Sequence, residues 1–150
     1  KYDISATLYW NVCFYSKYDG TTKERNVWTD PNSWVNANGD GYLLYPGTRY
    51  GLSTPISTLR LESLREGVDD YEYLYMLDEA LTKYNNIHST NYTTNSLISN
   101  LYDKIFIDGT VKCKTNVSSF SNARKQLLKL LEAISNDSSD AQNLINNLAI

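Results

Sequence analysis

Side chains that could perform acid–base chemistry are concentrated in residues 60–77, RLESLREGVDDYEYLYML. This segment holds two Arg, three Glu and two Asp among three Tyr and four Leu. A carboxylate acts as a general acid or base when it lies within hydrogen-bond reach of the reacting group. Glu62 and Arg65, however, lie one helical turn apart and can pair with each other. We therefore interpret Arg60, Glu62, Arg65 and Asp70 as a structural ion-pair network.

Histidine and cysteine offer little further chemistry. The only histidine, His88, lies in the polar stretch YNNIHSTNY, where nothing is positioned to tune a catalytic imidazole. Cys13 and Cys113 are the only cysteines and form no CxxC unit, so we expect no metal site and no cofactor. The two cysteines could form one disulfide or remain two separate buried thiols.

Aromatic residues are abundant, with 13 Tyr and three Trp among 150 residues. Trp28 and Trp34 lie in a long connection, residues 16–41, that is rich in Asp-Gly, Asp-Pro and Asn-Gly turn signals. Connections of this length within a compact domain are usually functional or disordered, and disordered segments hold few aromatics. We therefore expect a functional loop, with packing inside the protein as the alternative for these tryptophans and for Trp10.

Length and composition indicate one globular domain, because 150 residues suffice for one ordinary core and are few for two. The net charge of -3 offers no basic face for nucleic acid. No run of 18 apolar residues is present, so no transmembrane helix is expected. The first residues, KYDISATLYW, show no signal-type apolar region. No targeting segment is predicted, and we expect the chain to be part of something longer.

The order of elements places two strands before a set of helices. The expected elements are a buried strand that runs into a loop within 4–15, the connection at 16–41, a strand at 42–46, a helix from a cap at Ser57 or Thr58 to about residue 84, a helix at 94–106, a turn at 108–109, a helix at 118–134 capped by Ser118 or Ser119, and a short last helix within 138–150. Two strands alone do not make a stable sheet. The pattern predicts an α/β fold whose sheet is completed by a larger protein.

The first of these helices should carry a broad apolar face, because its apolar side chains recur at three- and four-residue steps. The members of that face are Leu61, Leu64, Val68, Tyr71, Leu74, Tyr75, Leu77 and Leu81. We expect its leucines and part of its tyrosines to be packed within the protein.

Several motifs occur together before and within that helix. They are Gly-Asp-Gly-Tyr at 39–42, Tyr-Pro-Gly at 45–47, Arg-x-Glu at 60–62 and Arg-Glu-Gly-Val-Asp-Asp-Tyr-Glu-Tyr at 65–73, with LYWNV at 8–12 and VWTDPNSW at 27–34 upstream. In this combination the chain resembles the end of the catalytic domain of family-123 glycoside hydrolases, the β-N-acetylgalactosaminidase group. The resemblance is dense over residues 6–84 and faint beyond them.

The resemblance implies a (β/α)8 barrel fold. Residues 1–84 would supply the last two strands, the aromatic loop and the closing helix, and residues 85–150 would form a helical extension. Active sites of such barrels lie at the carboxyl ends of the strands. The residues that this rule places on the sugar-binding face are Trp10, Asn11, Trp28, Trp34 and Tyr45. Flat rings there could stack on sugars, whereas Asn11 could instead cap its own loop.

The family is thought to use substrate-assisted retention, outside the usual two-carboxylate scheme. The substrate's acetamido oxygen attacks the anomeric carbon, an Asp orients the acetamide, and a neighbouring Glu is the general acid and base. That Asp–Glu pair belongs to an earlier barrel strand, so the resemblance implies no catalytic residue in this chain. Asp78 and Glu79 sit in mid-helix and are interpreted as a solvated pair. The chain alone should be inactive.

The expected partners are a glycan of the N-acetylhexosamine type and the missing amino-terminal part of the barrel, with no nucleic acid and no membrane. An exposed sheet edge could also let the isolated chain form a homodimer. We expect an extracellular or cell-surface location. Two other interpretations stay open: a non-catalytic carbohydrate-binding module, and a protein-interaction domain built on the helices.

Overall fold

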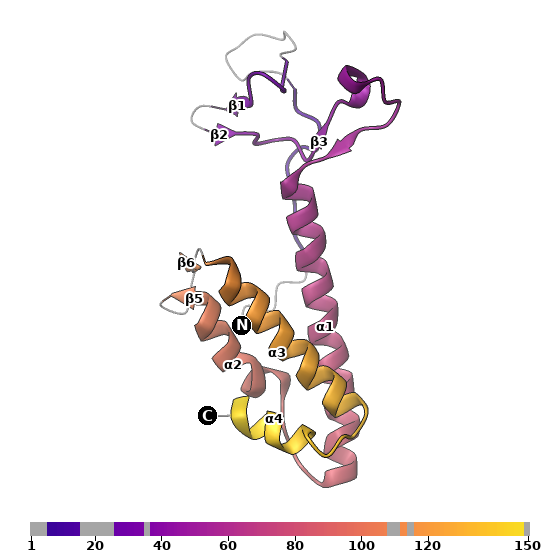
Figure 1. Cartoon of the computed structure of the whole chain (residues 1–150), viewed down its shortest axis with the longest axis vertical. Helices are drawn as coiled ribbons and strands as arrows, with labels where there is room; N and C mark the ends of the chain where they lie inside the picture. Colours follow the sequence, from indigo (N-terminus) through magenta and orange to yellow (C-terminus); the bar gives the residue numbers. More distant parts are fainter. Residues whose placement is uncertain (1–5, 16–25, 35–36, 108–111, 114–115, 149–150) are drawn as a thin grey trace. The chain divides into compact units, whose positions relative to one another are not determined.

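The chain forms two compact units, residues 1–67 and residues 68–150. Figure 1 shows short strands in the first unit and mainly helices in the second. The fold is therefore helix-rich and mixed, with small two-stranded sheets. The computed structural model describes residues 6–15, 26–34, 37–107, 112–113 and 116–148.

The first unit contains two antiparallel strand pairs. β1 (Asn32–Trp34) pairs with β2 (Ala37–Asn38), and β3 (Leu44–Tyr45) pairs with β4 (Ile56–Ser57). A short 3-10 helix, η1 (Gly47–Tyr50), follows β3. The strand predicted at 42–46 is confirmed at β3, whereas the β1–β2 hairpin lies inside the predicted long connection and was not expected.

The strand predicted at 4–15 is wrong for the residues described there. Residues 6–15 make a single bridge, between Cys13 and Tyr42, and it is antiparallel. Residues 4 and 5 lie outside the described part. β-branched and aromatic composition does not make a strand by itself, because a strand needs hydrogen-bonding neighbours to be stable. Neighbouring strands of a (β/α)8 barrel run parallel, so this bridge is not a barrel pairing.

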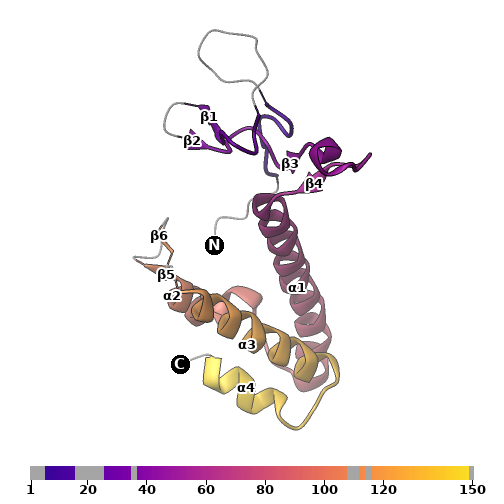
Figure 2. The same cartoon turned by 45° about the horizontal axis from the view of Figure 1, so that its top comes forward.

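The second unit packs helices around one core. Its elements are the later part of α1 (Leu59–His88), α2 (Thr94–Ile105), α3 (Val117–Ser135), α4 (Ala141–Leu148) and the antiparallel pair of β5 (Phe106–Ile107) and β6 (Lys112–Cys113). α2, α3 and α4 contact one another, as Figure 2 shows. Leu77, Leu97, Leu130 and Ile145, one from each helix, are fully buried in this core. The three helices predicted after the first are confirmed, and the turn predicted at 108–109 lies outside the described residues.

The end of α1 differs from prediction. α1 continues to His88, beyond the expected end near residue 84. Within this extra turn the Asn85 side chain donates to Tyr92 O at 2.8 Å and accepts from Tyr92 N at 3.0 Å. The helix stops where Ser89 takes a φ of 54°. The helix continues through polar residues because Asn85 binds the backbone of Tyr92 in the following segment. A pattern of apolar residues gives no sign of such a contact.

The helix caps are set by single side chains. The Thr58 hydroxyl accepts from Leu61 N at 3.2 Å, as predicted for the start of α1. α3 is capped by Asn116, whose side-chain oxygen accepts from Ser118 N at 3.0 Å. The prediction of Ser118 or Ser119 as this cap is wrong, because asparagine caps as well as serine and comes first in the chain.

The predicted apolar face of α1 is only partly buried. From Leu77 onward its members lie in the core of the second unit, together with Ala80 and Tyr84. The earlier members Leu64, Val68, Tyr71 and Tyr75 are exposed, and Leu61 and Leu74 are half-buried. The expectation that the whole face is packed is therefore wrong for its first half, because periodicity identifies a face and not what covers it.

Candidate functional site

Trp10 is held by the loop at residues 39–41. Its indole N–H donates to Asp40 Oδ1 at 3.0 Å, and its ring lies 5.0 Å from that of Phe14, tilted by 57°. The residue is 47% exposed. The polar edge of the indole is thus bound within the protein while much of its flat apolar surface stays accessible.

Both glycines of this loop have a left-handed backbone and close neighbours. Gly41 has a φ of 81°, and a Cβ there would lie 2.7 Å from Trp10 Cη2. Gly39 has a φ of 72°, and a Cβ there would lie 2.8 Å from Arg60 Cζ. Only glycine adopts this backbone without strain and leaves this space. The Asn-Gly-Asp-Gly sequence therefore fits two side chains, Trp10 and Arg60, against one turn.

A second aromatic group surrounds Trp28. The indole stacks on the ring of Tyr45, with centroids 4.4 Å apart and planes at 22°, and Tyr50 meets it edge-on at 5.0 Å. The Trp28 N–H donates to Pro46 O at 3.3 Å. Trp28 and Tyr45, two of the predicted sugar contacts, thus lie in one stack. Among the described residues no ring contact joins Trp10 to this stack.

The other two predicted sugar contacts add less. The Asn11 side-chain oxygen accepts from Cys13 N at 2.9 Å, which is the loop-capping contact that the sequence left open as an alternative. Trp34 ends β1, and its side chain lies outside the described part. Trp10, Trp28 and Tyr45 therefore carry the geometric argument for a binding surface.

The residues predicted as an ion-pair network divide between separate contacts. Arg65 pairs with Glu62 and with Glu66, each at 3.0 Å, and the Arg65 guanidinium lowers the pKa of Glu62. Arg60 instead donates to the Asn38 carbonyl. Arg65 thus pairs with residues next to it on α1, whereas Arg60 binds the backbone of the preceding loop, 22 residues earlier in the chain.

Asp70, the fourth member, ties two helices of the second unit together. Its Oδ1 lies 2.7 Å from Arg124 Nε, so it forms an ion pair between α1 and α3. The Arg124 guanidinium carbon also lies 5.7 Å from the centre of the Tyr73 ring. Arg124, which the sequence did not single out, therefore bridges a carboxylate and an aromatic ring on α1.

Tyr15 has the largest described change in acidity. Its hydroxyl donates to Leu44 O at 2.8 Å, and burial, with a smaller effect of neighbouring Cys13, raises the pKa of Tyr15 to about 12. Cys13 itself is an exposed free thiol, so the expectation of a buried thiol is wrong for this residue. The side chain of Cys113 lies outside the described part.

The single histidine contacts a carboxylate and an aromatic ring. His88 Nε2 lies 2.6 Å from Asp137 Oδ1, and its ring packs on that of Tyr84 at 4.3 Å. In the part of the chain that the structure describes, no group of three or more His, Cys, Asp or Glu residues could hold a metal ion. None of the described helices is both long and apolar enough to cross a membrane.

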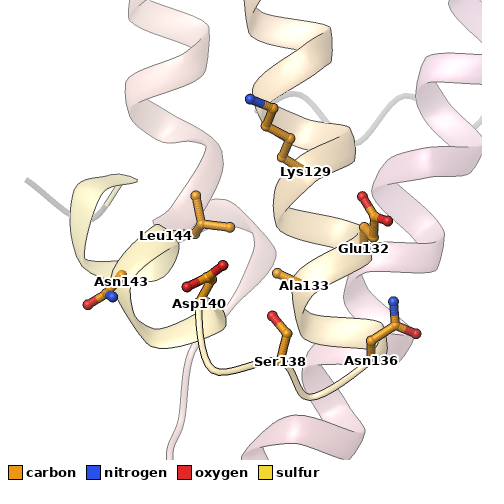
Figure 3. Close-up of a pocket in the computed structure, with 8 residues that line it drawn as sticks. All are labelled: Lys129, Glu132, Ala133, Asn136, Ser138, Asp140, Asn143 and Leu144. Carbon is orange, nitrogen blue, oxygen red and sulfur yellow. The ribbon is translucent and has the colours of Figure 1, made fainter.

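The second unit also has an open cavity of about 490 Å³, lined by α3, α4 and their connection. Figure 3 shows Lys129 and Glu132 on α3, Asn143 and Leu144 on α4, and Asp140 between the helices. No predicted site residue and no aromatic ring is among its described lining residues. The cavity can offer hydrogen bonds to a polar solute but no flat apolar platform.

Two residues that shape the aromatic surface were not predicted. Asp40 fixes the edge of Trp10, and Tyr50 packs against Trp28 from the 3-10 helix. The signal for Asp40 is its position between two glycines, where a turn brings other side chains close. For Tyr50 the sequence holds no comparable signal. Trp10 therefore presents an exposed ring, whereas Trp28 and Tyr45 are half-buried in a stack of their own.

Comparison with known proteins points in one direction. Residues 1–77 match the family model described as "Glycoside hydrolase 123, catalytic domain". The matched range is just over half of the 150 residues and includes the loop at 39–41, both aromatic groups and the ion pairs of Arg65. No curated protein and no solved structure matches the chain.

Proposed function

The chain belongs to the glycoside hydrolase 123 family, and from this premise we propose that it is the carboxy-terminal part of the catalytic domain of such an enzyme. The parent enzyme acts on glycans with N-acetylhexosamine of the N-acetylgalactosamine type, with retention through the substrate's own acetamido group. The chain supplies part of the sugar-binding wall and no catalytic acid, so it is inactive alone.

The observation that carries this proposal is the exposed, fixed indole of Trp10. Sugar rings have one face of C–H groups and a rim of hydroxyls, so they bind flat apolar surfaces that are already rigid. Asp40 holds the indole by its N–H, which limits the entropy lost when a ligand stacks on it. The Trp28–Tyr45 stack gives a second rigid aromatic surface within the matched range.

The acidic residues of α1 support a catalytic pair elsewhere in the parent. Glu62 and Glu66 pair with Arg65, and Asp70 pairs with Arg124. A catalytic acid needs a pKa near the working pH, whereas Arg65 lowers the pKa of Glu62. These carboxylates brace the helix, and we assign the Asp–Glu pair to an earlier strand of the parent.

The incomplete sheet of the first unit supports a larger parent fold. Its named strands are two or three residues long, and the apolar residues Leu8 and Val12 are exposed. In the proposed (β/α)8 barrel, residues 1–84 form the last two strands, the aromatic loop and the closing helix, and residues 85–150 form a helical extension. Pairing with parallel barrel strands there replaces the antiparallel bridge between Cys13 and Tyr42. The missing amino-terminal part of the barrel and a glycan are the proposed partners, and the location is extracellular or at the cell surface.

The test uses the complete parent. The reading frame upstream of this chain should encode the other six of eight strand–helix units, with an Asp–Glu pair at a strand end. The parent should hydrolyse an aryl N-acetyl-β-galactosaminide, and the chain alone should not. Trp10→Ala in the parent should raise KM more than it lowers kcat, whereas Leu52→Ala, a change at another exposed apolar residue, should alter neither.

Three results would contradict the proposal. An unrelated domain or a stop codon upstream would remove the barrel. Unchanged KM and kcat in the Trp10→Ala parent would remove the wall role of this chain. Hydrolysis by the isolated chain would show that it carries a catalytic group of its own.

A further inference from the structure

A groove of about 250 Å³ lies in the second unit, between α1 and the start of α2. Its walls are Tyr71, Leu74, Tyr75 and Asp78 on α1, and Thr93, Thr94 and Asn95 at the start of α2. We propose that this groove is a further carbohydrate-binding site, in which a sugar ring stacks on Tyr71 and Tyr75. The proposal rests on the proposed function only for the choice of a sugar as ligand.

The two tyrosines form an accessible aromatic pair. They are four residues apart, so they lie on one face of α1, and each is 57% exposed. No hydrogen bond occupies either phenol oxygen among the described residues. Each ring thus offers an apolar face and a polar tip, which are the two features that a sugar ring presents in return.

Polar groups converge on the same groove. Asp78 Oδ1 accepts from the Thr94 hydroxyl at 2.8 Å, which fixes the carboxylate. Its second oxygen has no hydrogen-bond partner among the described residues and can accept from a sugar hydroxyl. The amide of Asn95 can both donate and accept, whereas the Thr93 hydroxyl is already used in capping α2. A carboxylate beside an amide suits adjacent hydroxyls of one sugar.

The dimensions and charge favour a small neutral ligand. The groove is below the range of about 300–1,000 Å³ that is usual for sites of drug-sized ligands. Its described lining has one carboxylate and no Lys or Arg, which disfavours an anion. A stable protein partner would cover about 800 Å² on this chain, far more than the groove provides. The larger cavity beside α4 lacks a ring on which a sugar could stack.

The test is a titration of the isotope-labelled chain with methyl β-N-acetylgalactosaminide and with methyl β-galactoside, followed by amide NMR shifts. Shifts should appear in residues 71–78 and 93–95. Tyr75→Ala should weaken binding about tenfold, Tyr75→Phe should keep most of it, and Asp78→Asn should weaken it. Ile87→Ala removes a similarly exposed apolar side chain from the same helix outside the groove and should change nothing.

The outcomes separate this proposal from the preceding one. Shifts confined to the surroundings of Trp10 and Trp28 would overturn the groove and leave the proposed function standing. If the sugar binds in the groove but the parent shows no glycosidase activity, the groove stands and the proposed function is overturned. Absence of shifts with both sugars at millimolar concentration would overturn the groove. The groove would also be overturned if Tyr75→Ala destabilised the parent without changing its affinity for sugar, because the two rings would then serve only in packing.

Discussion

Replacing Gly41 with alanine should displace the Trp10 indole from its place against the loop. The new Cβ would lie 2.7 Å from Trp10 Cη2 and 2.9 Å from Phe14 Cβ, distances that real side chains do not tolerate. Either the indole or the turn must move. In both cases the hydrogen bond from the Trp10 N–H to Asp40 is lost or lengthened.

The expected cost has two parts. Alanine at a φ of 81° costs about 1–2 kcal/mol through its left-handed backbone. Loss of the exposed Trp10–Asp40 hydrogen bond adds about 1 kcal/mol. Gly51 has a φ of 69°, and a Cβ there would have no neighbouring atom within 4 Å, so Gly51→Ala should carry only the backbone part. The free energies of unfolding of the two variants should therefore differ by about 1 kcal/mol. This difference is the contribution of the hydrogen bond between Trp10 and Asp40.

Tryptophan fluorescence is the appropriate measurement, because Trp10, Trp28 and Trp34 all lie in the first unit. Urea unfolding of each variant gives the free energy of unfolding of that unit. The folded Gly41→Ala chain should also emit at longer wavelength than the Gly51→Ala chain, since its indole is more solvated. Equal free energies and equal emission for the two variants would refute the idea that the loop positions Trp10.

Further expectations concern stability, titration and association. Gly67→Ala should raise the free energy of unfolding by about 0.5–1 kcal/mol, measured by circular dichroism, because Gly67 lies in α1 with open space around it. Arg124→Gln should lower the free energy of unfolding by about 1 kcal/mol, because Arg124 loses its ion pair with Asp70 and its contact with the Tyr73 ring. The decrease should be smaller at high salt, which screens the ion pair. Lys125→Gln is the control and should have little effect. The folded pKa of Tyr15, about 12, lies above the ordinary 10.0, so its stabilising contribution is complete below pH 10 and is lost as pH rises toward 12. Phenolate absorbance should show this titration, and Cys13→Ala should move it to lower pH. The isolated chain should dimerise through an exposed strand edge, and a clean monomer in light scattering would contradict this.

The helices could be predicted because their apolar residues repeat with the helical period. For α3 the apolar period predicts a face of six residues. Five of them are buried and the first, Phe120, is exposed; the buried members are Ala123, Leu127, Leu130, Leu131 and Ile134. Helix ends depended on individual polar contacts instead. Asn85 extends α1 by binding Tyr92, a contact that becomes visible only when the chain after the helix is in place.

The aromatic surface could be predicted by residue type and not by arrangement. Trp10, Trp28 and Tyr45 were expected to share one face. Trp28 and Tyr45 do stack, yet the contacts that fix these rings come from Asp40 and Tyr50. Such contacts depend on turns with left-handed residues and on a 3-10 helix, neither of which has a repeating sequence pattern.

α1 shows most directly what an amphipathic pattern specifies. One uninterrupted period of apolar residues runs along the helix, but its members are fully buried only from Leu77 onward, which is where the family match ends. The pattern therefore specifies that a helix forms and which side is apolar, whereas burial also requires a neighbour of matching shape. In the second part of α1 that neighbour is formed by α2, α3 and α4. In the first part the same apolar side is covered only at Leu61 and Leu74, which are half-buried, and the rings of Tyr71 and Tyr75 stay exposed.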